Sequence, residues 1–298
     1  MAMPEIILSM TSYPQRIETT ATALEPLLHQ TVQPSRVLLW LPAGEFEEQG
    51  VSLPVRLAEL EAQVPFFEIR WTQESLKPHN KYFWTMLEYP DDLVITVDDD
   101  LVHATTLVQT LLDLHYRLPT ALITNRSHLV TLDADGAIAP YRSWEMEQGR
   151  YILCPRNDVI ATHGAGALFP PHTLPREAFD ADAIRATSLL ADDLWLMAWE
   201  YMNDVPVVST GLGGLYYIEG TQDISLYKRN LDQNENDLYL ARLYELFPSF
   251  HEKLLSRVGA RLEQEAAEAE EARRRRREAE EAGRVSYARR LVRKLRSL

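Results

Sequence analysis

Three consecutive carboxylates, Asp98, Asp99 and Asp100, directly follow the short apolar run at residues 93–97. The run is apolar on both faces and rich in aliphatic and β-branched residues, which is typical of a buried strand in a parallel sheet. Side chains alternate along a strand, so Asp98 and Asp100 are predicted to point the same way and Asp99 the other. Ligands of open α/β sheets gather at the carboxyl ends of the strands, where these residues would lie.

The repulsion among three adjacent carboxylates is relieved when a cation binds between them. A hard divalent ion, Mn²⁺ or Mg²⁺, suits carboxylate oxygens better than a soft metal does. The triplet is therefore a candidate site for such an ion. The alternative is an acidic strand-to-helix turn in which Asp100 caps the following helix.

A second acidic pair, Asp192 and Asp193, lies in the segment 188–203 and is predicted to open an amphipathic helix there. Acidic side chains in a first helical turn complement the helix dipole, so a structural role is the alternative to a chemical one. The small residues at 163–166, His-Gly-Ala-Gly, would let the backbone approach another group closely, or would form an ordinary glycine turn.

Alternating strand and helix patterns must position these groups. Apolar runs predict strands, and 3.6-residue spacing of apolar side chains predicts helices. The order of these elements predicts one α/β domain, with a parallel sheet and helices on both faces. The strands are expected at 5–10, 37–41, 67–71, 93–97, 121–125 and 205–209, a hairpin at 129–144, and helices at 17–30, 53–63, 105–117, 188–203 and 238–246.

The C-terminal part of the chain has a different composition from the rest. We divide the chain into a globular domain at 1–259, a charged Ala/Glu/Arg-rich helix at 260–283 and a basic amphipathic helix at 284–298, with Gly283 interrupting the helix. A basic amphipathic helix is attracted to anionic lipid, so the last segment is expected at a membrane surface. A partner-binding or frayed terminal helix is the alternative.

Charge and cysteine content limit the possible functions. The net charge of the 298-residue chain is -14, which disfavours general nucleic-acid binding because phosphates are repelled. The single cysteine, Cys154, fits a reducing compartment and is expected in the core. No signal peptide or membrane-spanning run is recognisable, so we expect a cytoplasmic protein, with any contact to the inner face of the plasma membrane peripheral.

Taken together, five short stretches resemble the GT-A glycosyltransferases, specifically the bacterial family-two-like sugar transferases. The stretches are residues 7–17, 77–84, 95–101, 164–166 and 191–195. The resemblance spans roughly residues 5–240 and leaves the C-terminal helical tail uncovered. It implies a GT-A-like, Rossmann-like fold with a mixed, mostly parallel sheet flanked by helices. It also implies transfer of a sugar from a nucleotide-sugar, with a UDP-sugar expected, to a glycan or lipid-linked acceptor in bacterial surface polysaccharide synthesis.

The resemblance also implies roles for the acidic triplet. Asp98 and Asp100 would hold the divalent cation against the donor diphosphate, and Asp99 would contact the ribose or the sugar. Lys81 would neutralise a phosphate, although it could equally be an exposed surface lysine.

Further residues are candidates for binding the nucleotide-sugar. Thr11, Tyr13 and Arg16 belong to the loop that packs the nucleoside in this fold, and Gly164 and Gly166 belong to the glycine-rich stretch.

In inverting members of the family, the second acidic pair supplies the base that takes the acceptor proton. Asp192 or Asp193 would serve, and the sequence does not separate them. The pair is Asp-Asp where the family commonly has Glu-Asp, and no histidine follows as an obvious third metal ligand.

The main alternative function is a haloacid-dehalogenase-like, Mg-dependent phosphohydrolase, which also carries an Asp-x-Asp at a strand end and a later Asp-Asp pair. Its nucleophile strand normally lies near the start of the chain, whereas 97 residues precede Asp98 here. A catalytically silent scaffold would leave both acidic features unexplained. The donor sugar, acceptor, linkage, stereochemistry and oligomeric state stay open.

Overall fold

The computed structural model describes residues 4–211, 216–221 and 234–295, with side chains described up to residue 280. The glycine turn expected at 211–214 and the polar loop expected at 225–237 fall mostly outside these ranges.

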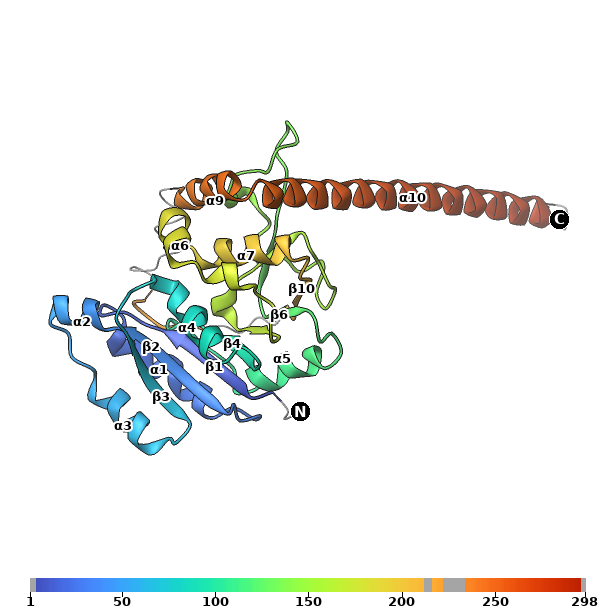
Figure 1. The fold of residues 1–298 in the computed structure, drawn as a ribbon. Coiled ribbons are helices and arrows are strands. Elements are labelled where there is room, and N and C mark those ends of the chain that lie inside the picture. Colours follow the sequence, from blue (N-terminus) through green and yellow to red (C-terminus); the bar gives the residue numbers. More distant parts are fainter. Residues whose placement is uncertain (1–3, 212–215, 222–233, 296–298) are drawn as a thin grey trace.

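A seven-stranded sheet in the order β10-β6-β9-β4-β1-β2-β3 forms the centre of the fold (Figure 1). Neighbouring strands are parallel except around β9, which is antiparallel to β4 and β6. The predicted mixed, mostly parallel sheet is therefore confirmed. Its strands are β1 (Ile6–Thr11), β2 (Arg36–Pro42), β3 (Phe67–Thr72), β4 (Leu93–Thr96), β6 (Leu122–Thr124), β9 (Ala167–Phe169) and β10 (Val207–Ser209).

Two short strand pairs lie outside this sheet. β5 (Leu101–Val102) pairs with β11 (Tyr216–Tyr217), and β7 (Ser127–Leu129) pairs with β8 (Val159–Ala161). The hairpin expected at 129–144 is reduced to isolated bridges, Leu132 with Ile138 and Leu129 with Glu145.

Helices cover both faces of the sheet, as predicted. They are α1 (Ile17–Leu28), α2 (Ala43–Gln49), α3 (Val55–Gln63), α4 (Asn80–Glu88), α5 (Leu107–His115), α6 (Ala181–Thr187), α7 (Asp192–Met202), α9 (Glu235–Leu246) and α10 (Pro248–Leu295), with 3₁₀ turns at Lys77–His79, Tyr141–Ser143, His163–Ala165 and Arg176–Phe179. The pattern did not predict α2, because only Phe46 of that helix is buried.

Alternation along β1 shows how the faces are built. Leu8 and Met10 join one apolar cluster with α1 and α5, while Ser9 points to the opposite face. There the Ser9 hydroxyl donates to the Lys81 carbonyl of α4 at 2.5 Å. This contact fixes the first turn of α4 against the strand that leads to the candidate site.

α10 is one continuous helix that runs through Gly283, so the predicted interruption there is wrong. A helical glycine costs only about 1 kcal/mol relative to alanine, which a long helix of good helix formers tolerates. The first part packs on the domain through buried Phe250, Leu254 and Val258. The helix then extends away from the domain (Figure 1).

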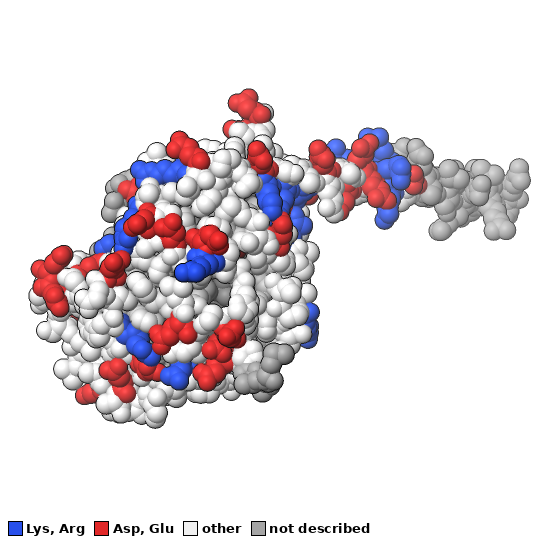
Figure 2. Space-filling view, in the orientation of Figure 1, with Lys and Arg blue, Asp and Glu red and all other residues white. Residues whose placement is uncertain are grey.

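Two features of the surface are the distribution of charge and the position of the single cysteine. Acidic and basic side chains are interspersed both over the visible face of the domain and along the described part of the tail (Figure 2). Cys154 is exposed, so the expectation that it packs in the core is wrong. Among the described residues, no helix combines the length and apolar character needed to span a membrane.

Candidate active site

The acidic triplet lies just beyond the C-terminal end of β4, against the glycine-rich turn. The backbone N–H of Asp98 donates to the Gly164 carbonyl at 3.0 Å. A β-carbon added to Gly164 would lie 1.7 Å from Oδ2 of Asp98, so a larger residue there requires the Asp98 carboxylate to move. The close backbone approach expected of residues 163–166 is thus made to Asp98.

Gly166 has a different environment. Its φ of +97° lies in the region that favours glycine, and an added β-carbon would meet Leu107 at 2.7 Å and the Asn125 side chain at 3.1 Å. The structure therefore places Gly164 at the triplet, whereas the nearest neighbours of a side chain at 166 belong to α5 and to the end of β6.

Lys81 connects the two acidic features. Its Nζ lies 2.6 Å from Oδ1 of Asp98 and 2.7 Å from Oδ2 of Asp192, and the lysine side chain is 2 % exposed. The alternative of an exposed surface lysine is therefore wrong. Burial alone would lower the Lys81 pKa, but Asp192 and Asp98 together hold it above its ordinary value.

Arg16 neutralises the other two carboxylates. Its Nη1 lies 2.8 Å from Oδ1 of Asp99, and its Nη2 lies 3.0 Å from Oδ2 of Asp100. The Ser12 hydroxyl donates to Oδ2 of Asp99 at 2.5 Å. Burial raises the pKa of Asp99 in spite of these contacts with Arg16 and Ser12. Asp99 thus anchors the loop after β1 through its contacts with Ser12 and Arg16.

The predicted alternation of the triplet is wrong. Asp99 and Asp100 share Arg16, whereas Asp98 pairs with Lys81. The physical reason is that β4 ends at Thr96 and residues 99–100 form a turn, so the two-residue strand period no longer applies.

Of the other two candidates in this region, Tyr13 contacts Arg16 and Thr11 contacts β2. The Arg16 guanidinium lies 5.5 Å from the centre of the Tyr13 ring. Thr11 is at the end of β1, where its hydroxyl donates to the Trp40 carbonyl at 2.8 Å. From the other side, the Ile218 N–H donates to the Asp100 carbonyl at 2.9 Å.

The two carboxylates of the second acidic pair differ in exposure. The side chain of Asp192 is 9 % exposed and faces Lys81, whereas that of Asp193 is 31 % exposed. Oδ1 of Asp193 accepts from the His163 backbone N–H at 2.9 Å and lies 2.8 Å from His163 Nδ1. On its other side, His163 Nε2 lies 2.8 Å from Oε1 of Glu200.

These contacts shift two pKa values. Burial alone would lower the His163 pKa, but Glu200 and Asp193 raise it to about 10. Burial alone would raise the Asp193 pKa, but the His163 hydrogen bonds and charge bring it below its ordinary value. Asp193 is therefore held as a carboxylate beside an imidazolium.

Sequence reasoning missed His163 and Glu200 as functional candidates. The available signal was on α7, where Glu200 follows Asp193 by seven residues and so returns to the same helical face two turns later. It also missed Arg126, whose guanidinium lies 2.8 Å from the Thr162 hydroxyl and 2.9 Å from the Tyr217 hydroxyl.

The residues around the triplet fit a divalent cation that binds together with a diphosphate. Four carboxylates (Asp98, Asp99, Asp100 and Asp192) meet only two cationic side chains in this cluster, leaving excess negative charge. Within the described ranges, no group of three or more His, Cys, Asp or Glu side chains is arranged to bind a metal ion by itself. Mg²⁺ shared with phosphates needs only one or two protein carboxylates, and the Asp98 side chain is 38 % exposed.

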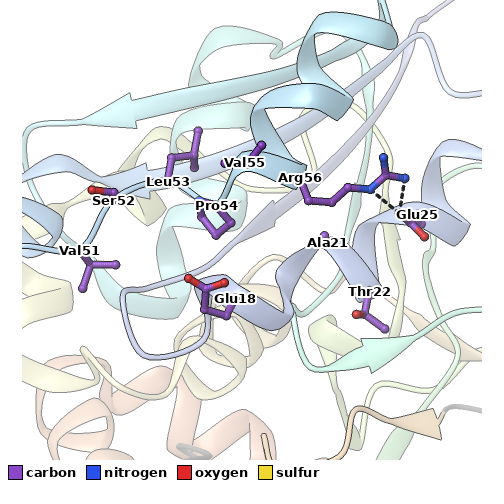
Figure 3. Close-up of a pocket in the computed structure, with 10 residues that line it drawn as sticks. All are labelled: Glu18, Ala21, Thr22, Glu25, Val51, Ser52, Leu53, Pro54, Val55 and Arg56. Carbon is purple, nitrogen blue, oxygen red and sulfur yellow. Dashed lines mark hydrogen bonds and ion pairs between the residues drawn. The ribbon is translucent and has the colours of Figure 1, made fainter.

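A separate groove of about 720 Å³ lies between α1 and the segment before α3 (Figure 3). Its lining includes Glu18, Glu25 and Arg56, and Arg56 donates two hydrogen bonds to Glu25, at 2.9 and 2.5 Å. None of the residues that line it belongs to the predicted site.

Comparisons with known proteins give limited similarity. No protein-family model and no curated protein matches the chain. Among solved structures, it is similar to S. aureus TarS, with a TM-score of 0.46 and 11% sequence identity over 74% of this chain. The match covers 38% of that protein's chain, so this chain spans well under half of its length.

Proposed function

We propose that the chain is a metal-dependent glycosyltransferase that moves a sugar from a nucleotide-sugar donor, a UDP-sugar, to a glycan or lipid-linked acceptor. The observation that carries this proposal is the meeting of all five stretches of the GT-A resemblance at one place. They contribute Arg16, Lys81, Asp98–Asp100, Gly164 and Asp192–Asp193. Side chains far apart in sequence thus form one charged cluster at the carboxyl edge of the sheet.

The triplet side of this cluster would bind the donor. Asp98 and Asp100 would hold Mn²⁺ or Mg²⁺, which when bound neutralises the charge that develops on the leaving diphosphate. Lys81 pairs with Asp98 and Arg16 pairs with Asp100, so both cations add positive charge beside the proposed diphosphate site. Thr11, at the end of β1, and Tyr13, on the loop after it, would contact the nucleoside.

The acceptor side of the reaction requires a base, and we assign this role to Asp193. Asp192 is buried and neutralises Lys81, whereas Asp193 is partly exposed and only its Oδ1 is engaged by His163. In an inverting transfer, the acceptor oxygen forms the new bond to the anomeric carbon as the bond to the diphosphate breaks. Asp193 takes the proton of the acceptor hydroxyl in that step.

The tail would hold the enzyme near a membrane-bound acceptor. The described part of the basic segment, residues 284–295, lies at the far end of a helix that extends from the domain (Figure 1). Attraction to anionic lipid would place the protein on the inner, cytoplasmic face of the plasma membrane, where surface polysaccharides are assembled.

Thermal unfolding with a panel of nucleoside diphosphates, each with and without Mn²⁺, tests the donor site. We expect UDP to stabilise the protein only when Mn²⁺ is present, because the cation links the diphosphate to the carboxylates. Asp100→Ala should abolish this shift, while Asp91→Ala, on an 84 % exposed side chain, should keep it. No nucleotide effect, together with hydrolysis of p-nitrophenyl phosphate, would instead favour the phosphohydrolase.

Co-sedimentation with lipid vesicles tests the tail. Deletion of residues 284–298 should release the protein from phosphatidylglycerol vesicles and leave its UDP-dependent stabilisation unchanged. Equal sedimentation of the truncated and full-length proteins would contradict the membrane proposal.

A further inference from the structure

The His163 imidazole lies between two carboxylates on one face of α7. Nδ1 is 2.8 Å from Oδ1 of Asp193, and Nε2 is 2.8 Å from Oε1 of Glu200. Residues 193 and 200 are seven positions apart, so a helix brings them to the same side about 10.5 Å apart along its axis. The ring stacks on Phe169, with centroids 5.3 Å apart, which fixes its plane.

The two hydrogen bonds set the number of protons in this group. A neutral imidazole carries one N–H, but each ring nitrogen here faces a carboxylate oxygen. Both bonds form at once only if His163 is an imidazolium or if one carboxyl is protonated. His163 is 0 % exposed and Glu200 is 1 % exposed, so an uncompensated charge would be costly in either place. An imidazolium between two carboxylates satisfies both bonds and leaves a single net negative charge.

Stability alone does not explain Glu200. Its second oxygen, Oε2, is buried and has no hydrogen-bond partner among the described atoms. Buried ion pairs are often no more stable than apolar side chains of similar size. A buried carboxylate with one unsatisfied oxygen indicates a role in setting the charge of His163.

We propose that Glu200 and His163 are positioning residues for the base Asp193. Glu200 keeps His163 protonated, and His163 holds Oδ1 of Asp193 through its ring and its backbone N–H. The carboxylate is thereby fixed in orientation and stays ionised, and its second oxygen is left to accept the proton of the acceptor hydroxyl. This inference rests on the proposed transferase function.

Other titratable groups interact with the same carboxylate. Lys81 contributes positive charge to Asp193 from α4, and Arg126 and His128 interact with it from the segment at β7. These groups are unchanged when Glu200 is substituted. A change in the titration of His163 therefore reports on its contact with Glu200.

Nitrogen-15 NMR of the histidine side chains tests the charge state without any activity assay. In the wild type, both His163 ring nitrogens should be protonated at pH 7.5 and should lose a proton only near pH 10; the signal is assigned by its absence in His163→Gln. In Glu200→Gln, His163 should be neutral at pH 7.5, whereas the exposed control Glu245→Gln should match the wild type. A neutral His163 in the wild type, or an unchanged titration in Glu200→Gln, would overturn the inference.

The pH dependence of turnover then tests the effect on Asp193. In Glu200→Gln, the acid limb of the kcat profile should move to higher pH, because Asp193 loses its neighbouring positive charge, while the donor KM stays within about twofold. A uniform loss of kcat at every pH would show a structural role only. If Glu200→Gln does not fold, Glu200→Asp should give an intermediate shift in the NMR titration. Absent turnover in the wild type would refute the transferase, while the NMR result would still decide the charge of His163.

Discussion

The backbone of Gly164 lies so close to the Asp98 carboxylate that a β-carbon at position 164 would come within 1.7 Å of Oδ2. The same turn delivers the His163 N–H to Asp193. Two adjacent residues therefore connect the proposed metal-binding carboxylate to the proposed base, and the relative position of the two depends on one short 3₁₀ turn.

Gly164→Ala should displace the Asp98 side chain. Because Asp98 is partly exposed, the carboxylate can rotate away, so we expect little loss of stability. The Mn²⁺-dependent affinity for UDP should fall at least about tenfold, equivalent to about 1.4 kcal/mol. Isothermal titration calorimetry measures this change. The matched control is Gly149→Ala, where an added β-carbon meets no atom within 4 Å; equal affinities in the two variants would contradict the prediction.

Lys81→Met should be strongly destabilising. It leaves Asp192 buried without its cation, and breaking a buried pair in this way costs about 3–5 kcal/mol. Urea unfolding gives the loss in the free energy of unfolding. Lys77→Met is the control, because Lys77 pairs with Glu45 but is 39 % exposed, and such a pair is worth about 0–1 kcal/mol. Addition of Asp192→Asn should recover part of the loss, and no recovery would contradict this explanation.

Stability should fall as the pH drops from about 6.5 toward 4. Burial lowers the pKa of His79 to about 4 from an ordinary value of 6.5, so the unfolded chain binds a proton before the folded one does. The contribution of His79 is therefore present above pH 6.5 and is lost on acidification. Urea midpoints at pH 7 and pH 4.5 measure it. His79→Gln should reduce the pH dependence, while His172→Gln, on a 71 % exposed side chain, should not.

The pKa of His163 is raised, so its contribution to stability has the opposite sign. It should be complete below pH 6.5 and should decrease as the pH rises toward about 10. The difference between the urea midpoints at pH 7 and pH 9.5 should therefore be smaller in Glu200→Gln than in the wild type. An equal difference in midpoint for the two proteins would contradict this expectation.

Arg261→Met should loosen α10 from the domain. The Arg261 side chain is 3 % exposed, pairs with Asp158 at 3.3 Å and donates to the Val130 carbonyl. Arg156 still neutralises Asp158, so we expect a loss of about 1–3 kcal/mol. Hydrogen exchange in the packed first part of α10 should accelerate. Arg275→Met, on a 74 % exposed side chain paired with Glu271, should have almost no effect; equal exchange in both variants would refute the role of Arg261.

Local patterns in the sequence predicted the framework well. Apolar runs place β1, β2, β3 and β4 within a few residues of their observed bounds, because a strand or helix core is specified by near neighbours in the chain. The acidic triplet at the end of β4 and the acidic pair at the start of α7 were recognisable for the same reason.

Errors arose where local rules stop applying. The triplet follows β4 as a turn, so alternation no longer predicts which way its side chains point. Gly283 did not interrupt α10, because a single unfavourable residue is outweighed by a long favourable run.

By itself, the sequence determined that carboxylates would stand at the ends of particular strands and helices of an α/β sheet. Only the tertiary structure decided which cation neutralises which carboxylate. Lys81 is buried between Asp98 and Asp192, Arg16 binds Asp99 and Asp100, and Asp193 pairs with His163. These pairs join residues tens of positions apart, and they depend on how α4 and α7 pack on the sheet. That packing is a property of the whole core and has no local periodicity from which it could be read.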